Sequence, residues 1–380
     1  MIYLDNAATT YPKPPQVLQA VNYSLKYYGA NPGRAGHAMS MAAAEEIYRC
    51  RTAVADFFQA PGPECVAFTL NCTHAMNIVL KGLLKPGDHV VTSCLEHNAV
   101  MRPLQALQKK GITYTMAQVV PGDNDATVDA FRKALRADTK LIVCTHVSNV
   151  WGIRLPIERL AALGHEYGVP IAVDCAQSAG VLPVNMQDNR FDYLCVAAHK
   201  GLYAPMGMGI LITPNGSGLD TLMEGGTGTS SISLDQPDTM PDRMESGTVN
   251  VPGIAGLRAG VEFVKSKTPE RIYAHEMALV QMLHRDLSRM KGVRLYTPEP
   301  VEPCFAPVLS FNLEGQDSEI VAKKLGDMGI AVRAGLHCAP KAHEFMGTLE
   351  QGAVRVCPSA FSTPNEVRAF SNAIMKINRK

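Results

Sequence analysis

The chain has 380 residues, of which 46% are hydrophobic, and a formal net charge of +1 at pH 7. This charge balance excludes a whole-protein field that attracts nucleic acid or an anionic membrane. No apolar run reaches the roughly 18 residues that a membrane-spanning helix needs. The length exceeds that of one ordinary hydrophobic core, so it predicts two domains. The ten cysteines form no CxxC pair, which predicts reduced thiols in a cytoplasmic protein without a structural metal.

Short apolar runs alternate with stretches of helical spacing through the first two thirds of the chain. The runs are 65–70, 89–95, 140–147, 169–174, 192–198 and 209–213. Continuous apolarity is typical of strands that are covered on both faces, and the alternation predicts a mostly parallel, doubly wound α/β sheet.

The last third of the chain predicts a smaller α+β domain. A long helical stretch covers about 255–291, and strands are expected at 307–313 and 329–335. We therefore expect an N-terminal segment (1–15) that packs with the small domain, a large domain (16–255) and a small C-terminal domain (256–380).

Polar side chains stand directly after the predicted strands. Ligands bind beyond the carboxyl ends of strands in open α/β sheets, so these residues are candidates for one site. They are Asn71–His74, Glu96–Asn98, Asn149, Asp174–Ser178 and His199–Lys200.

Lys200 and Asp174 each end a buried strand. A partly desolvated lysine amine suits Schiff-base chemistry, whereas the alternative is a lysine that reaches out to solvent. A carboxylate could keep a bound pyridine ring protonated, and Gln177 could bind the ring hydroxyl. The alternative for Asp174 is a helix cap or a turn.

Thr73 and His74 stand at the start of a helix, where backbone amides and a hydroxyl could hold a phosphate. The alternative is a simple helix cap. His97 could stack on a ring or relay protons, or could be a surface histidine. The planar fork of Arg355 suits a carboxylate, although a surface ion pair is the commoner role. The stretch "GGTGT" (225–229) lacks a strand–loop–helix setting and is expected to be a flexible loop.

Cys338 lies in the polar stretch "VRAGLHCAPK" (332–341), which glycine and proline interrupt. The other cysteines mostly fall in apolar runs and are expected to be buried and inert. A thiol in such a loop is either incidental or placed to react, and Arg333 and His337 could supply positive charge that lowers its pKa.

Eight blocks of the chain, in order and from end to end, resemble the cysteine desulfurases, which are class V, fold-type-I pyridoxal-phosphate (PLP) enzymes. The Cys338 block and the short distance to Arg355 are close to the group that includes SUF-type desulfurases and selenocysteine lyases. The blocks are "YLDNAATT", "EHNAV", "VSNVWG", "VDCAQSAG", "AHKGLYAPMGMGIL", "ESGTVNVPGIAGL", "RAGLHCAP" and "VRVCPSAFST".

The resemblance implies a role for each matching position around PLP. Lys200 would bind the cofactor covalently, Asp174 would pair with the pyridine nitrogen, Gln177 would meet the ring oxygen and His97 would stack on the ring. Thr73, His74 and His199 would bind the phosphate. Thr248 would reach the phosphate in the neighbouring subunit of a homodimer.

The resemblance also implies the substrate and the nucleophile. Asn149 and Arg355 would hold the carboxylate end of L-cysteine, and Cys338 would take its sulfur as a persulfide and pass it to an acceptor protein, as in iron–sulfur cluster biogenesis. Ala197 stands where relatives often have a phosphate-binding serine, and Leu336 where they often have a second histidine. Both put phosphate affinity and thiol activation into question.

Three other functions are compatible with these residues. A selenocysteine lyase would act on L-selenocysteine without needing the thiol, and an aminotransferase would need a keto-acid acceptor. A non-enzymatic scaffold of the same fold would not use Lys200, Asp174 and Cys338.

Overall fold

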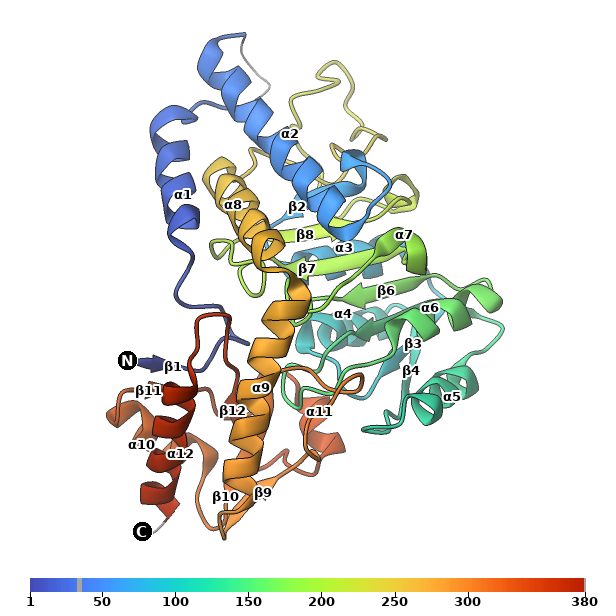
Figure 1. The fold of residues 1–380 in the computed structure, drawn as a ribbon. Coiled ribbons are helices and arrows are strands. Elements are labelled where there is room, and N and C mark those ends of the chain that lie inside the picture. Colours follow the sequence, from blue (N-terminus) through green and yellow to red (C-terminus); the bar gives the residue numbers. More distant parts are fainter. Residues whose placement is uncertain (33–35, 379–380) are drawn as a thin grey trace.

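The computed structural model describes residues 1–32 and 36–378 (Figure 1). Its main element is a seven-stranded sheet with the strand order β2-β8-β7-β6-β5-β3-β4. Strands β3 to β7 are mutually parallel, whereas β8 is antiparallel to both β7 and β2. The strands are β2 (Val66–Thr69), β3 (His89–Ser93), β4 (Thr113–Ala117), β5 (Thr139–Thr145), β6 (Ile171–Asp174), β7 (Tyr193–Ala197) and β8 (Gly209–Ile212). The mostly parallel α/β sheet is therefore confirmed.

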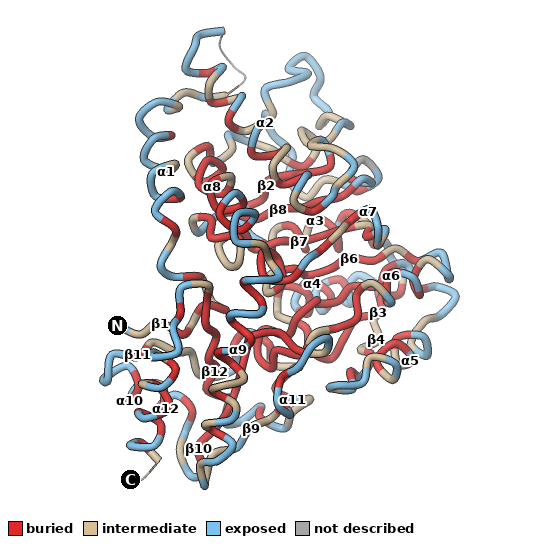
Figure 2. Tube along the Cα trace, viewed as in Figure 1, coloured by how far each residue is buried: buried red, intermediate tan, exposed pale blue. Residues whose placement is uncertain are grey.

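Helices cover both faces of this sheet, which explains why its strands are continuously apolar. Neighbouring residues of one strand enter opposite cores: Val91 packs in one and Val90 in the other. Figure 2 shows the central strands as buried. One core includes residues of α3 (Cys72–Leu83) and α4 (Asn98–Gln108); the other includes residues of α2 (Ala38–Phe58), α5 (Asn124–Ala134), α6 (Ile157–Glu166) and α7 (Met186–Asn189).

The C-terminal part is built on a three-stranded antiparallel sheet with the order β12-β10-β9. Its strands are β9 (Val293–Leu295), β10 (Leu309–Leu313) and β12 (Val354–Val356), and its helices are α9 (Pro269–Ser288), α10 (Ser318–Asp327), α11 (Pro340–Phe345) and α12 (Pro364–Asn378). The N-terminal strand β1 (Ile2–Tyr3) pairs in parallel with β11 (Ile330–Ala331). The chain's first residues thus lie against its last third.

The predicted helix over 255–291 is wrong as a single element. Two helices, α8 (Val251–Lys267) and α9, meet at Thr268, whose φ of 65° ends the first, and Pro269 begins the second. A residue at positive φ breaks the helical path, and proline is favoured in the first turn that follows. The strand expected at 329–335 is also shorter: Ile330–Ala331 form β11, and beyond it Arg333 makes only an isolated bridge with Arg355.

Strand β4 was not predicted because it is the exposed edge of the sheet and carries a polar sequence. The boundary expected at residue 255 stays a prediction. Helix α8 packs against α1 (Pro15–Tyr27) and α2, whereas α9 packs against α12 and β9. We therefore propose that the two domains divide near Thr268. Within the described ranges, no helix combines the length and apolarity that a bilayer crossing requires.

Candidate active site

A cavity of about 220 Å³ lies at the carboxyl ends of the parallel strands, where the C-terminal part meets the sheet. The structure brings eight of the predicted site residues together in its wall; they are Thr73, His97, Asn149, Asp174, Gln177, His199, Lys200 and Arg355. The other three, His74, Thr248 and Cys338, do not line it. The site is therefore assembled from distant segments of the chain.

Asp174 and Lys200 approach the cavity from neighbouring strands. Asp174 is the last residue of β6, and its Oδ1 accepts hydrogen bonds from the Ala176 amide at 2.8 Å and from the Cys72 thiol at 3.4 Å. Lys200 follows β7, the strand paired with β6. Its side chain is surrounded by protein except toward the cavity, and this desolvation, with help from the Arg355 charge, lowers the pKa of the lysine. The amine is thereby favoured in its neutral, nucleophilic form.

The N-terminal segment holds the turn that carries Lys200. The Thr10 hydroxyl donates to the Lys200 carbonyl at 2.9 Å, and the Lys13 amine donates to the His199 carbonyl at 2.6 Å. Thr9 Oγ1 lies 3.0 Å from His199 Nδ1. The sequence alone gives Thr9, Thr10 and Lys13 no role, because the groups that they contact lie about 190 residues away.

His97 caps helix α4, and its Nδ1 accepts the Ala99 amide at 3.0 Å. In a neutral imidazole the other nitrogen, Nε2, then carries the hydrogen. Burial lowers the pKa of His97 to about 4, so the ring is neutral at pH 7. It lines the cavity and is not a surface histidine.

Helix α3 begins with a side-chain cap, which was the alternative to a phosphate site at Thr73 and His74. The cap residue is Asn71. Asn71 Oδ1 accepts the His74 amide at 2.9 Å, and His74 Nδ1 accepts the Leu70 amide at 3.3 Å. His74 therefore turns away from the cavity, while Thr73 lines it. Ala197 also lines it and offers no hydroxyl, as its identity implies.

Arg355 is 1% exposed and forms a buried network with Asp5 and Asn149. Its guanidinium donates to Asp5 Oδ1 at 2.8 Å and to the Asn149 carbonyl at 2.9 Å. Arg355 Nε and Asn149 Oδ1 have no hydrogen-bond partner among the described residues. Buried polar atoms seldom remain unpaired, so this wall of the cavity retains one donor and one acceptor for a ligand.

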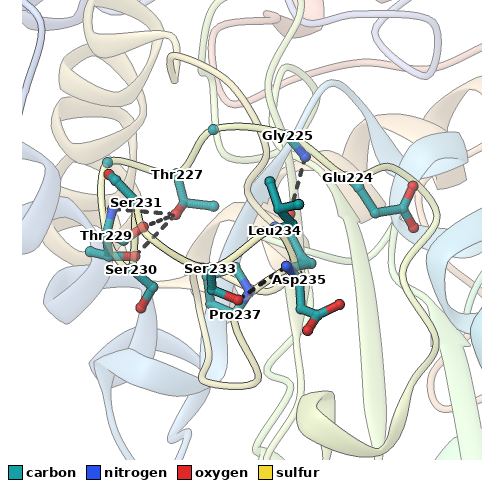
Figure 3. A pocket seen from close by; sticks show the side chains of 13 residues that line it. Glu224, Gly225, Thr227, Thr229, Ser230, Ser231, Ser233, Leu234, Asp235 and Pro237 are labelled. Atoms are coloured by element: carbon teal, nitrogen blue, oxygen red, sulfur yellow. Dashed lines mark hydrogen bonds between the residues drawn. The ribbon is translucent and has the colours of Figure 1, made fainter.

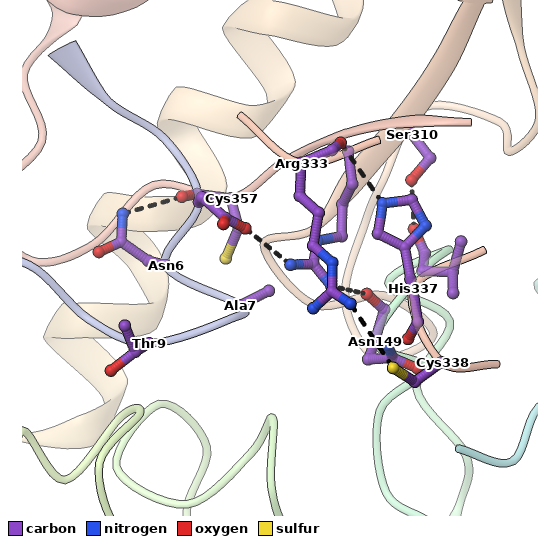
Figure 4. Close-up of polar contacts among 12 residues, drawn as sticks. Asn6, Ala7, Thr9, Asn149, Ser310, Arg333, His337, Cys338 and Cys357 are labelled. Carbon is purple, nitrogen blue, oxygen red and sulfur yellow. Dashed lines mark hydrogen bonds and ion pairs between the residues drawn. The ribbon is translucent and has the colours of Figure 1, made fainter. Parts of the chain in front are cut away.

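Cys338 lies beside the cavity and is exposed. Arg333 lines the cavity and donates to the Cys338 sulfur at 3.5 Å (Figure 4). The Asn98 amide donates to the Cys338 carbonyl at 2.7 Å. Eight of the remaining cysteines are buried and Cys304 is partly buried. Cys338 is therefore the exposed thiol among buried ones, as its position in a polar loop predicts.

The expectation that His337 supplies positive charge to this thiol is wrong. His337 is 2% exposed, and burial next to Arg355 lowers its pKa to about 2. The imidazole is therefore neutral at any physiological pH. Arg333 is the cation that contacts the sulfur.

A larger cavity of about 620 Å³ lies inside the loop 224–237 (Figure 3). Hydroxyls and backbone groups line it, as in the contact between Thr227 and Thr229 at 3.0 Å. Ile232 and Leu234 extend fully into solvent from the same loop. Thr248 follows this region and is also exposed. The loop carries none of the amine and acid groups that meet around Lys200.

Comparison with known proteins matches residues 2–370 to the model of the family described as aminotransferase class-V. The chain belongs to the class-V aminotransferase family. A probable cysteine desulfurase of Methanothermobacter thermautotrophicus is 32% identical over 99% of this chain and 94% of its own.

Solved structures of the same family agree with this likeness. The apo cysteine desulfurase of Thermococcus onnurineus has a TM-score of 0.93 and 31% identity, covering 100% of this chain and 94% of its own. The Escherichia coli cysteine desulfurase CsdA, in an S-sulfonic acid form, has a TM-score of 0.88 and 26% identity, covering 98% and 94%. The resemblance to cysteine desulfurases and the fold type are thus confirmed.

Asp5 is the residue of this class-V site that sequence reasoning missed, and its loss has a measurable consequence. We expect Asp5→Asn to raise KM for the amino-acid substrate about tenfold, with a smaller change in kcat, because Arg355 loses the partner that orients it. Glu262→Gln removes an exposed partner of Arg258 at 2.6 Å and is expected to change neither constant. Steady-state kinetics distinguishes the two variants, and equal KM values for Asp5→Asn and the unmodified protein contradict the expectation.

Glu96 predicts a pH dependence of stability. Burial raises its pKa from 4.5 to about 8, and Oε1 accepts from the Ser93 hydroxyl and the Thr145 amide while Oε2 has no partner among the described residues. The folded chain therefore holds a proton that the unfolded chain releases above pH 4.5. The free energy of unfolding should fall as pH rises from about 5 to about 8, by up to roughly 1.4 kcal/mol per pH unit from this group.

The variant Glu96→Gln keeps the acceptor and removes this titration. We expect its stability to exceed that of the unmodified protein increasingly as pH rises from 5 to 8, as measured by urea unfolding at several pH values. Two curves that stay parallel over this range argue against a protonated Glu96.

Proposed function

We propose that the chain is a PLP-dependent cysteine desulfurase that transfers sulfur from L-cysteine to Cys338. The observation that carries this proposal is the meeting of the Lys200 amine and the Asp174 carboxylate in one cavity wall, next to an exposed thiol that a cavity-lining arginine contacts. An amine, an acid and a thiol are the groups that the reaction requires, and the relatives named above are cysteine desulfurases.

The residues of the cavity fit PLP. Lys200 offers an amine with a lowered pKa for covalent attachment, Asp174 has a second carboxylate oxygen for the ring nitrogen, and Gln177 lies within the same wall. The neutral His97 imidazole suits contact with a ring face. When bound, PLP supplies an electron sink that stabilises negative charge at the substrate Cα.

The phosphate would be held at the start of α3, where Thr73 and the helix amides are available, and by His199. We leave His74 out of this seat, because its backbone amide donates to Asn71 Oδ1 and its ring nitrogen accepts the Leu70 amide. Thr248 of the partner subunit would complete this seat in a homodimer. Support comes from the exposure of Thr248 and from the exposed apolar side chains Ile232 and Leu234 in the neighbouring loop, which a partner could cover.

The chain's own groups then have definite tasks. Arg355 Nε donates to the substrate carboxylate, and Asn149 lies beside it with Nδ2 bound to the His337 carbonyl at 2.8 Å and Oδ1 free to accept. The Lys200 amine takes the proton from Cα, with the Nε2–H of His97 available nearby. The Cys338 thiolate, paired with Arg333, attacks the substrate sulfur. A sulfur–sulfur bond forms as the carbon–sulfur bond breaks, so that cysteine and the enzyme thiol become alanine and an enzyme persulfide.

The exposure of Cys338 leaves the persulfide accessible to an acceptor protein. We also infer a cytoplasmic location, which is supported by the ten cysteines: all lie within the described ranges and all are free thiols. The proposal includes no role for nucleic acid or membrane.

The test is incubation of the purified protein with cysteine and with selenocysteine, followed by measurement of alanine, sulfide and selenide. Alanine from cysteine, together with a persulfide on Cys338, is the expected result. Turnover of selenocysteine alone identifies a selenocysteine lyase instead, and a requirement for a keto acid identifies an aminotransferase.

A further inference from the structure

The segment that presents the thiol has an unusual backbone. His337 and Cys338 are consecutive non-glycine residues with φ values of 51° and 56°. Residues other than glycine seldom adopt this left-handed backbone conformation. Two such residues in succession persist only where the surrounding structure holds them. The backbone of this turn is held by the Asn98 amide, which donates to the Cys338 carbonyl at 2.7 Å, and by Asn149 Nδ2, which donates to the His337 carbonyl at 2.8 Å. The His337 side chain provides a further attachment.

A chain of hydrogen bonds lies directly behind the turn. His337 Nε2 is 3.4 Å from the Arg333 carbonyl, His337 Nδ1 is 3.3 Å from His343 Nε2, and His343 Nδ1 is 2.8 Å from Thr348 Oγ1. All three side chains are at most 2% exposed. Figure 4 shows His337 reaching the Arg333 backbone while the Arg333 side chain extends to Cys338.

The donors in this chain have one consistent direction. The Arg333 carbonyl only accepts, so His337 Nε2 carries a hydrogen and its Nδ1 accepts. His343 Nε2 must then donate and its Nδ1 accept, which directs the Thr348 hydroxyl to that nitrogen at 2.8 Å and not to the His343 carbonyl at 3.3 Å. Burial lowers the pKa of His337 to about 2 and that of His343 to about 4, so both rings are neutral, as this direction requires.

The ring geometry agrees with a nitrogen-to-nitrogen contact. The two imidazole planes differ by 7° with centroids 5.5 Å apart, a spacing that suits rings joined edge to edge. Trp151 packs against His343 at 5.2 Å, and its indole donates to the Ala342 carbonyl at 2.9 Å. The His343 ring is thus also held by its contact with Trp151.

We propose that Thr348, His343 and His337 form a positioning chain that sets the place of the Cys338 thiol. The positioning chain holds the backbone carbonyl of Arg333 through His337. The guanidinium of the same arginine contacts the Cys338 sulfur. None of the three residues is proposed to touch the substrate. The catalytic meaning of the chain rests on the proposed function, whereas its effect on the thiol does not.

The test compares Thr348→Val with Thr348→Ser. Valine keeps the shape but removes the only hydroxyl that donates to His343 Nδ1, whereas serine keeps that hydroxyl. We expect Thr348→Val to lower kcat for cysteine about tenfold with KM within about twofold, because a displaced thiol loses its alignment with the substrate sulfur while Arg355 stays in place. Thr348→Ser should remain within about twofold of the unmodified protein.

A second measurement requires no turnover. The rate at which iodoacetamide alkylates Cys338 in the substrate-free, full-length protein, followed by peptide mass spectrometry, should fall about threefold in Thr348→Val as the thiol leaves Arg333. It should not change in Thr348→Ser. His343→Phe keeps the ring volume against Trp151 and should behave like Thr348→Val, which provides a second variant if the first folds poorly.

The positioning chain is supported if kcat and the alkylation rate of Cys338 fall in Thr348→Val and His343→Phe but are retained in Thr348→Ser. Equal alkylation rates in all variants overturn it, as does an equal loss in the valine and serine variants. If the unmodified protein makes no alanine from cysteine, the proposed function fails, and the alkylation rates alone decide the inference.

Discussion

Replacement of Lys200 with alanine should remove the visible absorbance of bound PLP and lower alanine formation from cysteine by roughly 10³-fold or more. Two proposed tasks of Lys200 would be lost together: covalent attachment of the cofactor and removal of the Cα proton. Burial and the Arg355 charge lower the pKa of this amine, and among the residues that line the cavity there is no second lysine to replace it.

The measurement is an absorbance spectrum of the variant reconstituted with PLP, combined with an alanine assay. Lys200→Arg serves as the matched variant, because it keeps a long basic side chain after β7 but cannot attach the cofactor. Both variants should be inactive and both should fold, as circular dichroism can verify. A Lys200→Ala protein that keeps the absorbance band and the activity refutes the assignment of this residue.

Replacement of Cys338 with serine should separate cofactor binding, which is kept, from sulfur transfer, which is lost. We expect PLP absorbance and cysteine binding to be retained, because Cys338 does not line the cavity, while sulfur transfer from cysteine falls by roughly 10²-fold or more. A hydroxyl has almost no anionic form at neutral pH and cannot form a persulfide.

Cys304→Ser is the control for this experiment, since Cys304 is the other cysteine that is not fully buried and it lies outside the cavity. It should keep full activity. Labelling of the persulfide followed by peptide mass spectrometry should find the added sulfur on Cys338 in the unmodified protein and nowhere in Cys338→Ser. Undiminished alanine formation from cysteine in Cys338→Ser contradicts the proposed transfer, and retention on selenocysteine alone indicates a lyase.

Much of the large domain was predictable because its signals are local. Strands such as β5 and β6 are buried on both faces, and this requirement produces the apolar runs that the sequence displays. Asp174 and Lys200 follow such runs, so the pleated sheet necessarily carries both side chains to the same edge. The edge strand β4 has no such apolar run, because one of its sides is not covered, and so the sequence does not predict it.

The sequence alone determined the family, the mostly parallel sheet and the identities of the amine, the acid and the exposed thiol, because each has a local pattern. The tertiary structure alone decided that Asp5 pairs with Arg355 across 350 residues, that His74 turns away from the cavity, and that His337 is a neutral link in a buried chain. Charge state and pairing depend on which distant groups exclude water from a side chain, and that depends on packing and has no local pattern in the sequence.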